Sequence, residues 1–281
     1  NKTRIAVIGD SYIAGLEPGY KNAIPYLLEQ KLGSNKHEVY NFGIGGAHLS
    51  QYLHMFNKEV LKYNPSLIIF LVIHNDFAPS YSSDLTASGR YGGTFLTLSI
   101  SGDGNIVENN PKPYNPKWDK LLDFRLIRFI FYQHKLRTRI SYIKNLVLNE
   151  QYEMNMKPSS FNDTLNRDRV LAKYVVSKIM NTAKKRGIKI LFVMNGDTQS
   201  IYKRTKPDED SKPIKLNKMM RKITEDNDAH FLDLQEIFYN DFKVNNKKFE
   251  FKTDGHWSPY GHSIASDALT KKTREILNIT K

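Results

Sequence analysis

An α/β fold built around a parallel sheet is the architecture that this sequence predicts. Short apolar runs rich in β-branched residues alternate along the chain with longer segments of helical periodicity. The run 67–73 is apolar at every position, which is typical of a central parallel strand buried on both faces. Together these patterns predict a three-layer α/β/α sandwich with about five parallel strands.

The expected elements follow one another with boundaries at glycine, proline and polar turns. Strands are expected at 5–8, 37–41, 67–73, 189–194 and 230–232. Helices are expected at about 20–31, 49–63, 167–186, 213–227 and 259–277, with a polar loop over 201–212. One domain spanning 1–281 would hold all of them, because this length can enclose a single large core.

Residues from about 77 to 163 interrupt the alternation and are expected to form an insertion. The segment 94–100 alternates, Gly102-Asp103-Gly104-Asn105 is a turn, and Ile106-Val107 resume a strand, which predicts a β-hairpin. A helical segment is expected over about 119–149, where basic residues are interleaved with apolar ones. Two interpretations stay open for it, a packed helix with a solvated basic face or a peripheral contact with an anionic membrane or glycan.

Composition narrows the classes of function. The chain has no cysteine, which excludes disulfides, thiolate metal sites and cysteine nucleophiles. No apolar run approaches the ~20 residues needed to cross a bilayer. The net charge of +13 fits either a lysine-rich surface or attraction to an anionic partner. With no nucleic-acid-binding motif present, no nucleic-acid partner is expected.

The location of the protein stays open at this stage. The chain opens with Asn1 and shows no signal peptide. A bacterial cell-envelope or secreted location, with a leader or anchor upstream, and a cytoplasmic location are both compatible with the sequence. The oligomeric state is likewise open.

Four polar blocks lie where the predicted strands end or the last helix begins. They are Gly9-Asp10-Ser11-Tyr12, the glycine-rich stretch 41–48, His74-Asn75-Asp76 and Asp254-Gly255-His256-Trp257. The carboxyl ends of parallel strands are where open α/β sheets bind ligands. A serine there can act as a nucleophile if a histidine within hydrogen-bond reach takes its proton. A carboxylate near that histidine can orient the imidazole.

These four blocks, in this order, resemble those of the SGNH (GDSL-type) hydrolase superfamily, and in particular its bacterial polysaccharide-associated members. The resemblance implies an SGNH/flavodoxin-like fold and a serine esterase that needs no cofactor. It implies that Ser11 is the nucleophile, His256 the general base and Asp254 the residue that orients His256. The oxyanion donors would be the backbone amides of Ser11 and Gly46, with Gly45 as the alternative to Gly46, and the side chain of Asn75.

Two departures from the family pattern affect the expected site. The usual Asp-x-x-His spacing is Asp-x-His here, so Asp233 or a backbone carbonyl could orient the ring in place of Asp254. His74 stands where the family often has glycine and should narrow or polarise the pocket. His48, His74 and Trp257 are the expected substrate contacts. No histidine pair has zinc-site spacing, so no metal is expected.

The sequence thus predicts an esterase that hydrolyses a small acyl ester, such as acetyl on a carbohydrate, through an acyl-enzyme on Ser11. Three alternatives stay open. The same residues could serve an O-acetyltransferase that modifies a surface polysaccharide, or a lipid esterase or thioesterase. The fold could also be catalytically inactive and bind glycan.

Overall fold

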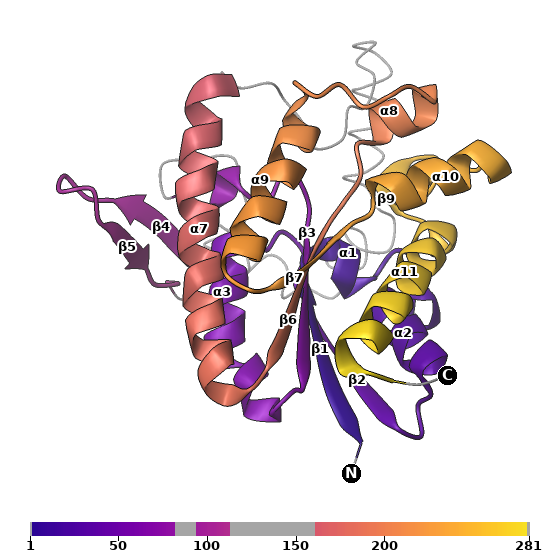
Figure 1. Ribbon diagram of the computed structural model, residues 1–281, viewed down its shortest axis with the longest axis horizontal. Coiled ribbons are helices and arrows are strands. Elements are labelled where there is room, and N and C mark those ends of the chain that lie inside the picture. The colour runs from indigo at the N-terminus through magenta and orange to yellow at the C-terminus, as the bar shows by residue number, and fades with distance from the viewer. Residues whose placement is uncertain (1, 82–93, 113–160, 280–281) are drawn as a thin grey trace, which may run out of the picture.

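The computed structural model describes residues 2–81, 94–112 and 161–279. Five parallel strands form the central sheet in the order β2-β1-β3-β6-β7 (Figure 1). The strands are β1 (Thr3–Gly9), β2 (His37–Gly43), β3 (Leu67–Val72), β6 (Lys189–Met194) and β7 (His230–Asp233). The predicted α/β sandwich with a five-stranded parallel sheet is therefore confirmed.

Both faces of the sheet are covered by helices, which explains why the central strand β3 is apolar and buried at every position. Along β1, Ala6 and Ile8 face one core whereas Ile5 and Val7 face the other, following the period of two of a strand. The helices α3 (Leu49–Lys58), α7 (Phe161–Arg186) and α9 (Lys212–Asp226) contribute to the first core. The helices α2 (Ile24–Leu32), α10 (Gln235–Asn245) and α11 (Pro259–Leu277) cover the opposite face (Figure 1).

Two expected helices are shorter than the sequence pattern indicated. The helix expected at 20–31 starts as a 3-10 turn, η1 (Tyr20–Asn22), and α2 begins only after Ala23, with Pro25 in its first turn. Proline is tolerated there because the first helical amides have no intrahelical acceptor. The helix expected at 49–63 ends at Lys58, and a second 3-10 turn, η2 (Val60–Tyr63), follows it.

The C-terminal part contains four elements that the sequence pattern missed. The prediction of a loop at 201–212 is wrong at its start, because residues 201–203 belong to the helix α8 (Thr198–Lys203). The side chain of Asp197 caps this helix. The helix α10 was not expected from the sequence, although Phe238 and Phe242 anchor it in the core. The strands β8 (Glu250–Phe251) and β9 (Asp254–Trp257) pair as a hairpin too short to give a periodic signal.

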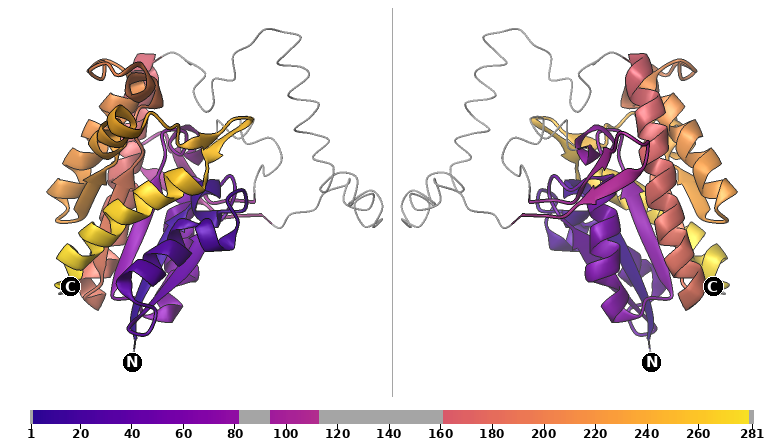
Figure 2. Two further views of the ribbon diagram at one scale, coloured as in Figure 1. Left: turned by 90° about the vertical axis from the view of Figure 1, so that its right-hand side faces the viewer. Right: turned by 90° about the vertical axis from the view of Figure 1, so that its left-hand side faces the viewer.

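The expected hairpin is present in the region of the insertion. The strands β4 (Thr97–Ile100) and β5 (Ile106–Asn109) pair antiparallel and extend beside α3 and α7 (Figures 1 and 2). A short 3-10 turn, η3 (Ala78–Ser80), precedes them. The helix expected over 119–149 lies outside the described residues, so its two interpretations, like the single-domain prediction, stay open. Within the described ranges, no helix is both long and apolar enough to cross a membrane.

Candidate active site

The strand register brings the first three sequence blocks to one edge of the sheet. In the sheet, Gly9 pairs with Gly43 of β2, and Ile8 pairs with Phe70 of β3. The loops that follow β1, β2 and β3 therefore emerge side by side, at the carboxyl ends where such sheets bind ligands. These loops carry Ser11, Gly46 and Asn75 respectively, so the expected nucleophile and oxyanion donors come from neighbouring strands.

The Gly-Asp-Ser block builds a helix start directly after β1. The side chain of Asp10 accepts the backbone N–H of Tyr12 at 2.9 Å and so caps the short helix α1 (Ser11–Ala14). Because Ser11 is the first residue of α1, its own N–H has no acceptor within the helix. The local sequence thus presents the serine hydroxyl and a backbone donor on the same residue.

A close backbone approach fixes α1 against β2. A Cβ atom added to Gly43 would lie 2.1 Å from the amide nitrogen of Ala14, so any side chain there would displace the helix that carries Ser11. A Cβ at Gly45, two residues further along, would meet nothing within 4 Å. Glycine is therefore required sterically at the first position and not at the second.

The fourth block folds back to Ser11 from the other end of the chain. The Nε2 atom of His256 lies 2.8 Å from the Ser11 hydroxyl oxygen, although the two residues are 245 positions apart. The Nδ1 atom of His256 lies 2.5 Å from Oδ1 of Asp254, and that same oxygen accepts the backbone N–H of His256 at 3.0 Å. With Nδ1–H directed to the carboxylate, Nε2 is free to accept the serine proton.

The short Asp-x-His spacing suits this arrangement, because residues two apart on a strand project to the same side. Asp254 and His256 both lie on β9. The alternative carboxylate, Asp233, is engaged elsewhere, since it accepts a side-chain N–H of Asn217 and the backbone N–H of Gln235. The structure therefore places Asp254, rather than Asp233, against the imidazole.

A contact between α1 and the β8–β9 hairpin holds the serine and histidine segments together. The Tyr12 hydroxyl donates to the Gly255 carbonyl at 2.8 Å. The Tyr12 ring also lies against the rings of His256 and Trp257, with centroid separations of 5.4 and 4.9 Å. Sequence reasoning gave Tyr12 no role, because its partners lie more than 240 residues away.

Two of the three expected substrate contacts are contradicted by burial. Trp257, the last residue of β9, is fully buried in the core. His48 is 2% exposed, its Nδ1 atom is 3.0 Å from the Ser50 hydroxyl, and burial lowers its pKa to about 4. Neither side chain presents the surface that a substrate would need.

The third expected contact, His74, is partly exposed and belongs to a polar network at the end of β3. Its Nε2 atom lies 2.9 Å from Oδ1 of Asn217. The Asn217 amide nitrogen donates to the Asn195 carbonyl and to the carboxylate of Asp233, both at 2.9 Å. Asn217 thus offers His74 only an acceptor, so Nε2 carries the ring proton. A substrate contact through His74 remains a prediction.

Two buried carboxyl groups lie beneath the site. Burial raises the pKa of Asp10 to about 6, against the opposing effects of the Tyr12 N–H and the nearby His256. Burial and the proximity of Asp10 raise the pKa of Asp76 well above its usual range. Asp76 accepts the Ile73 N–H at 2.9 Å and the Tyr52 hydroxyl at 2.8 Å. Both residues thus accept backbone amides of the loops that build the site.

One carboxylate near the imidazole was not anticipated. Oε1 of Glu17 lies 3.8 Å from Nδ1 of His256. Within the described part of the chain, Glu17, Asp254 and His256 form a group whose ligand atoms lie within 4.8 Å of one another. Because Nδ1 and Asp254 already satisfy each other, we interpret the group as acid–base machinery rather than as a metal centre.

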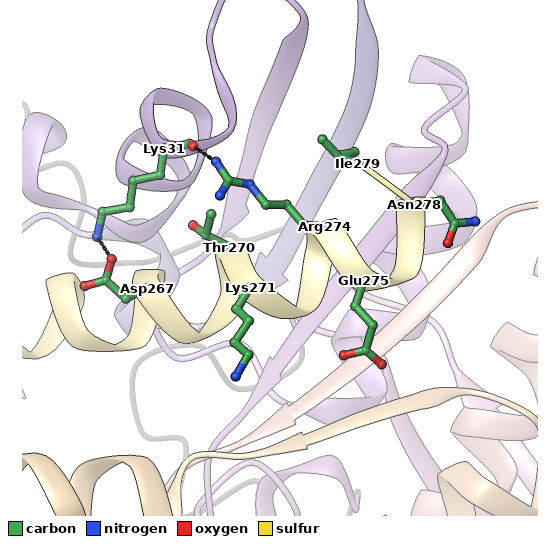
Figure 3. A pocket seen from close by; sticks show the side chains of 8 residues that line it. All are labelled: Lys31, Asp267, Thr270, Lys271, Arg274, Glu275, Asn278 and Ile279. Carbon is green, nitrogen blue, oxygen red and sulfur yellow. Dashed lines mark hydrogen bonds and ion pairs between the residues drawn. The ribbon is translucent and has the colours of Figure 1, made fainter. Parts of the chain in front are cut away.

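The hollow drawn in Figure 3 lies away from this chemistry. It has a volume of about 980 Å³ and opens between Lys31 of α2 and the last turns of α11. Arg274 donates to the Lys31 carbonyl there, and Lys31 pairs with Asp267. The hollow lies towards the end of α11 that is remote from β9, so it contributes no residue to the site around Ser11 (Figure 1).

Comparisons with known proteins agree with the geometry. The family model of the GDSL-like lipase/acylhydrolases matches residues 5–269. No curated protein matches the chain.

Among solved structures, similar folds include the lipase/acylhydrolase from Enterococcus faecalis, with 12% identity, a TM-score of 0.51 and coverage of 98% of this chain and 96% of that one. The acetyl xylan esterase AlAXEase is 14% identical, with a TM-score of 0.51 and coverage of 96% and 98%. A catalytic mutant of an acetylxylan esterase from Geobacillus stearothermophilus is 13% identical, with a TM-score of 0.51 and coverage of 97% and 95%. At these identities the structural likeness concerns the fold alone. The family match over nearly the whole chain shows that this protein belongs to the GDSL-like lipase/acylhydrolase family and is a serine hydrolase.

Proposed function

We propose that the protein is an esterase that hydrolyses a small acyl ester, such as acetyl on a carbohydrate. The observation that carries the proposal is the hydrogen-bonded chain from Ser11 through His256 to Asp254, with separations of 2.8 and 2.5 Å. Heavy-atom distances of about 2.6–3.2 Å are those at which a base can take the proton of a nucleophile.

In the proposed reaction, the Ser11 oxygen attacks the ester carbonyl carbon while its proton passes to Nε2 of His256. The tetrahedral intermediate collapses, the bond to the alkoxy group breaks, and His256 returns the proton to the departing sugar hydroxyl. A water molecule then attacks the acyl-enzyme, again giving its proton to His256. Release of the acid and return of that proton to Ser11 complete the cycle.

The negative charge of each tetrahedral intermediate would be held by the amides of Ser11 and Gly46 and by the side-chain amide of Asn75. The positions of these residues at three adjacent strand ends support that assignment. Removal of one such donor typically costs about 10²–10³ in kcat. Gly46 has a φ of 76°, which suits glycine in a loop that must turn its amide towards a ligand.

Two observations support a small acyl group on a polar carrier. The side chains of Asp254 and His256 are 32% and 27% exposed, so the site opens to solvent and can accept a bulky alcohol component. Two of the structures with a similar fold are acetyl xylan esterases by name. An open site also leaves room for a carbohydrate around the ester.

The test compares p-nitrophenyl acetate, butyrate and octanoate, together with acetate release from acetylated xylan. We expect acetate to be the preferred ester and Ser11→Ala to lower kcat/KM by at least about 10³-fold. Native activity in Ser11→Ala would overturn the mechanism. A preference for octanoate would instead favour a lipid esterase, and acetyl transfer to a sugar without acetate release would favour a transferase.

A further inference from the structure

We propose that Glu17 is a positioning residue for His256, a second carboxylate that holds the imidazole ring and compensates its positive charge alongside Asp254. The inference deepens the proposed esterase function and rests on it. Three features of the described residues support it: the contacts at Nδ1, the build of the loop that carries Glu17, and the charge that develops on the ring.

A second carboxylate lies close to Nδ1, although Asp254 already accepts the ring N–H. Asp254 directs one oxygen, Oδ1, at both the ring N–H and the backbone N–H of His256. Oε1 of Glu17 lies 3.8 Å from the same Nδ1 atom, within ion-pair distance but too far for a hydrogen bond. Among the described residues, His256 is the only basic side chain within 4.0 Å of the Glu17 carboxylate. The Glu17 carboxylate is therefore directed at the imidazole of His256.

The loop that carries Glu17 is built to return it to the site. Gly15 and Gly19 flank the loop, with φ values of 64° and 79°, in the left-handed region that favours glycine. The side chain of Asn22 donates to the Pro18 carbonyl at 2.9 Å and fixes the far end of the loop. Leu16 is 82% exposed, whereas Pro18, directly after Glu17, is buried and holds the loop against the domain.

The two carboxylates reach His256 from different parts of the molecule. Asp254 is two residues away on the same strand, so its contact is local and moves with the hairpin. Glu17 follows α1, the helix that begins with Ser11. The Glu17–His256 contact therefore links the segment of the nucleophile to the segment of the base, in the same way as the Tyr12–Gly255 hydrogen bond.

The contact between Glu17 and His256 becomes more favourable during the reaction than it is in the free enzyme. When His256 takes the serine proton, the ring becomes a cation with both carboxylates at Nδ1. An interaction that strengthens in the transition state raises kcat rather than substrate binding. If Asp254 is removed, Glu17 is the one remaining carboxylate of the described residues within 4.0 Å of Nδ1, so the two residues act as partial substitutes for each other.

The experiment is a double-mutant cycle with Glu17→Gln and Asp254→Ala. Two rates are measured, kcat/KM on p-nitrophenyl acetate and the labelling of Ser11 by a fluorophosphonate. We expect Glu17→Gln alone to lower kcat about 3–10-fold with KM unchanged. We expect Asp254→Ala to cost about tenfold more in the Glu17→Gln background than in the native chain, because substitution is then impossible. Glu17→Asp should recover part of the loss that Glu17→Gln causes.

The matched control is Leu16→Ala, which changes the same loop without touching the carboxylate and should leave both rates and the unfolding temperature unchanged. A cycle in which the two losses simply multiply, or native rates in Glu17→Gln, would overturn the role of Glu17. If Asp254→Ala does not fold, the comparison of Glu17→Gln with Glu17→Asp decides, and equal rates in these two variants would refute the proposal. Failure of the esterase function itself is distinguished by Ser11→Ala, which would then leave hydrolysis unchanged.

Discussion

Replacing Gly43 with alanine should damage catalysis without altering any group that takes part in it. The added methyl would lie 2.1 Å from the amide nitrogen of Ala14 and 2.5 Å from the carbonyl carbon of Ile13, both in the backbone of α1. Ordinary contact begins at 3.4 Å, so α1 or the loop after β2 must move by about 1 Å. Since α1 begins with Ser11, that movement separates the nucleophile from His256.

The magnitude follows from the rigidity of both partners. Overfilling a packed site typically costs about 1–3 kcal/mol of unfolding free energy. A displacement of about 1 Å at a reacting group can cost about 10²-fold in rate. We therefore expect Gly43→Ala to lower kcat/KM on p-nitrophenyl acetate about a hundredfold, and to lower the unfolding temperature by about 2–4 °C for each kcal/mol lost.

The assay pairs steady-state hydrolysis with thermal unfolding, and Gly45→Ala is the matched control in the same loop. A Cβ at Gly45 meets nothing within 4 Å, so its unfolding temperature should equal that of the native protein. The activity of Gly45→Ala reports separately on whether this stretch of backbone faces the substrate. Native activity and native stability in Gly43→Ala would refute the steric argument.

Two further predictions concern the polar groups around the site. Asn217→Ala should lower the unfolding free energy by about 1–3 kcal/mol, because it removes the hydrogen-bond partner of His74 and one of the donors to the Asp233 carboxylate. A denaturant midpoint equal to the native one would contradict this. Asp10→Asn should change how stability depends on pH. Because burial raises the folded-state pKa of Asp10 from 3.8 to about 6, the folded protein holds this proton more tightly than the unfolded chain. The contribution of this proton to the unfolding free energy is complete below about pH 4 and is lost as the pH rises through 6. The fall in urea midpoint between these two pH values should therefore be smaller in Asp10→Asn than in the native protein. An identical fall in both proteins would show that Asp10 does not titrate in this way.

The fold was predictable because its main signals are local. A strand buried on both faces must be apolar, and this pattern identifies β3 over its whole length and β6 from Ile190 onwards. The sequence pattern did not predict elements whose stability comes from packing against segments far away along the chain. The helix α10 depends on Phe238 and Phe242 entering the core, and β8 and β9 exist only because each pairs with the other. Nothing within segments as short as β8 and β9 distinguishes them from loops.

The candidate site divides in the same way. Ser11, Asn75 and His256 stand at strand ends or before a helix, and their order along the chain was enough to nominate them. The roles of His48 and Trp257 could not be judged in the sequence, because a polar or aromatic side chain beside a motif can face either the pocket or the core. Both face the core. Glu17 and Tyr12 carried no sequence signal, since their partners lie on β9 at the other end of the chain.

By itself, the sequence determined the order of strands and helices and the chemical groups placed at the strand ends, since backbone preference and apolar periodicity act over a few residues. Only the tertiary structure decided which carboxylate meets His256, which aromatic side chains are buried, and why Gly43 has no side chain. These properties depend on distances between segments far apart along the chain, and such distances are fixed when the two layers of helices close over the sheet.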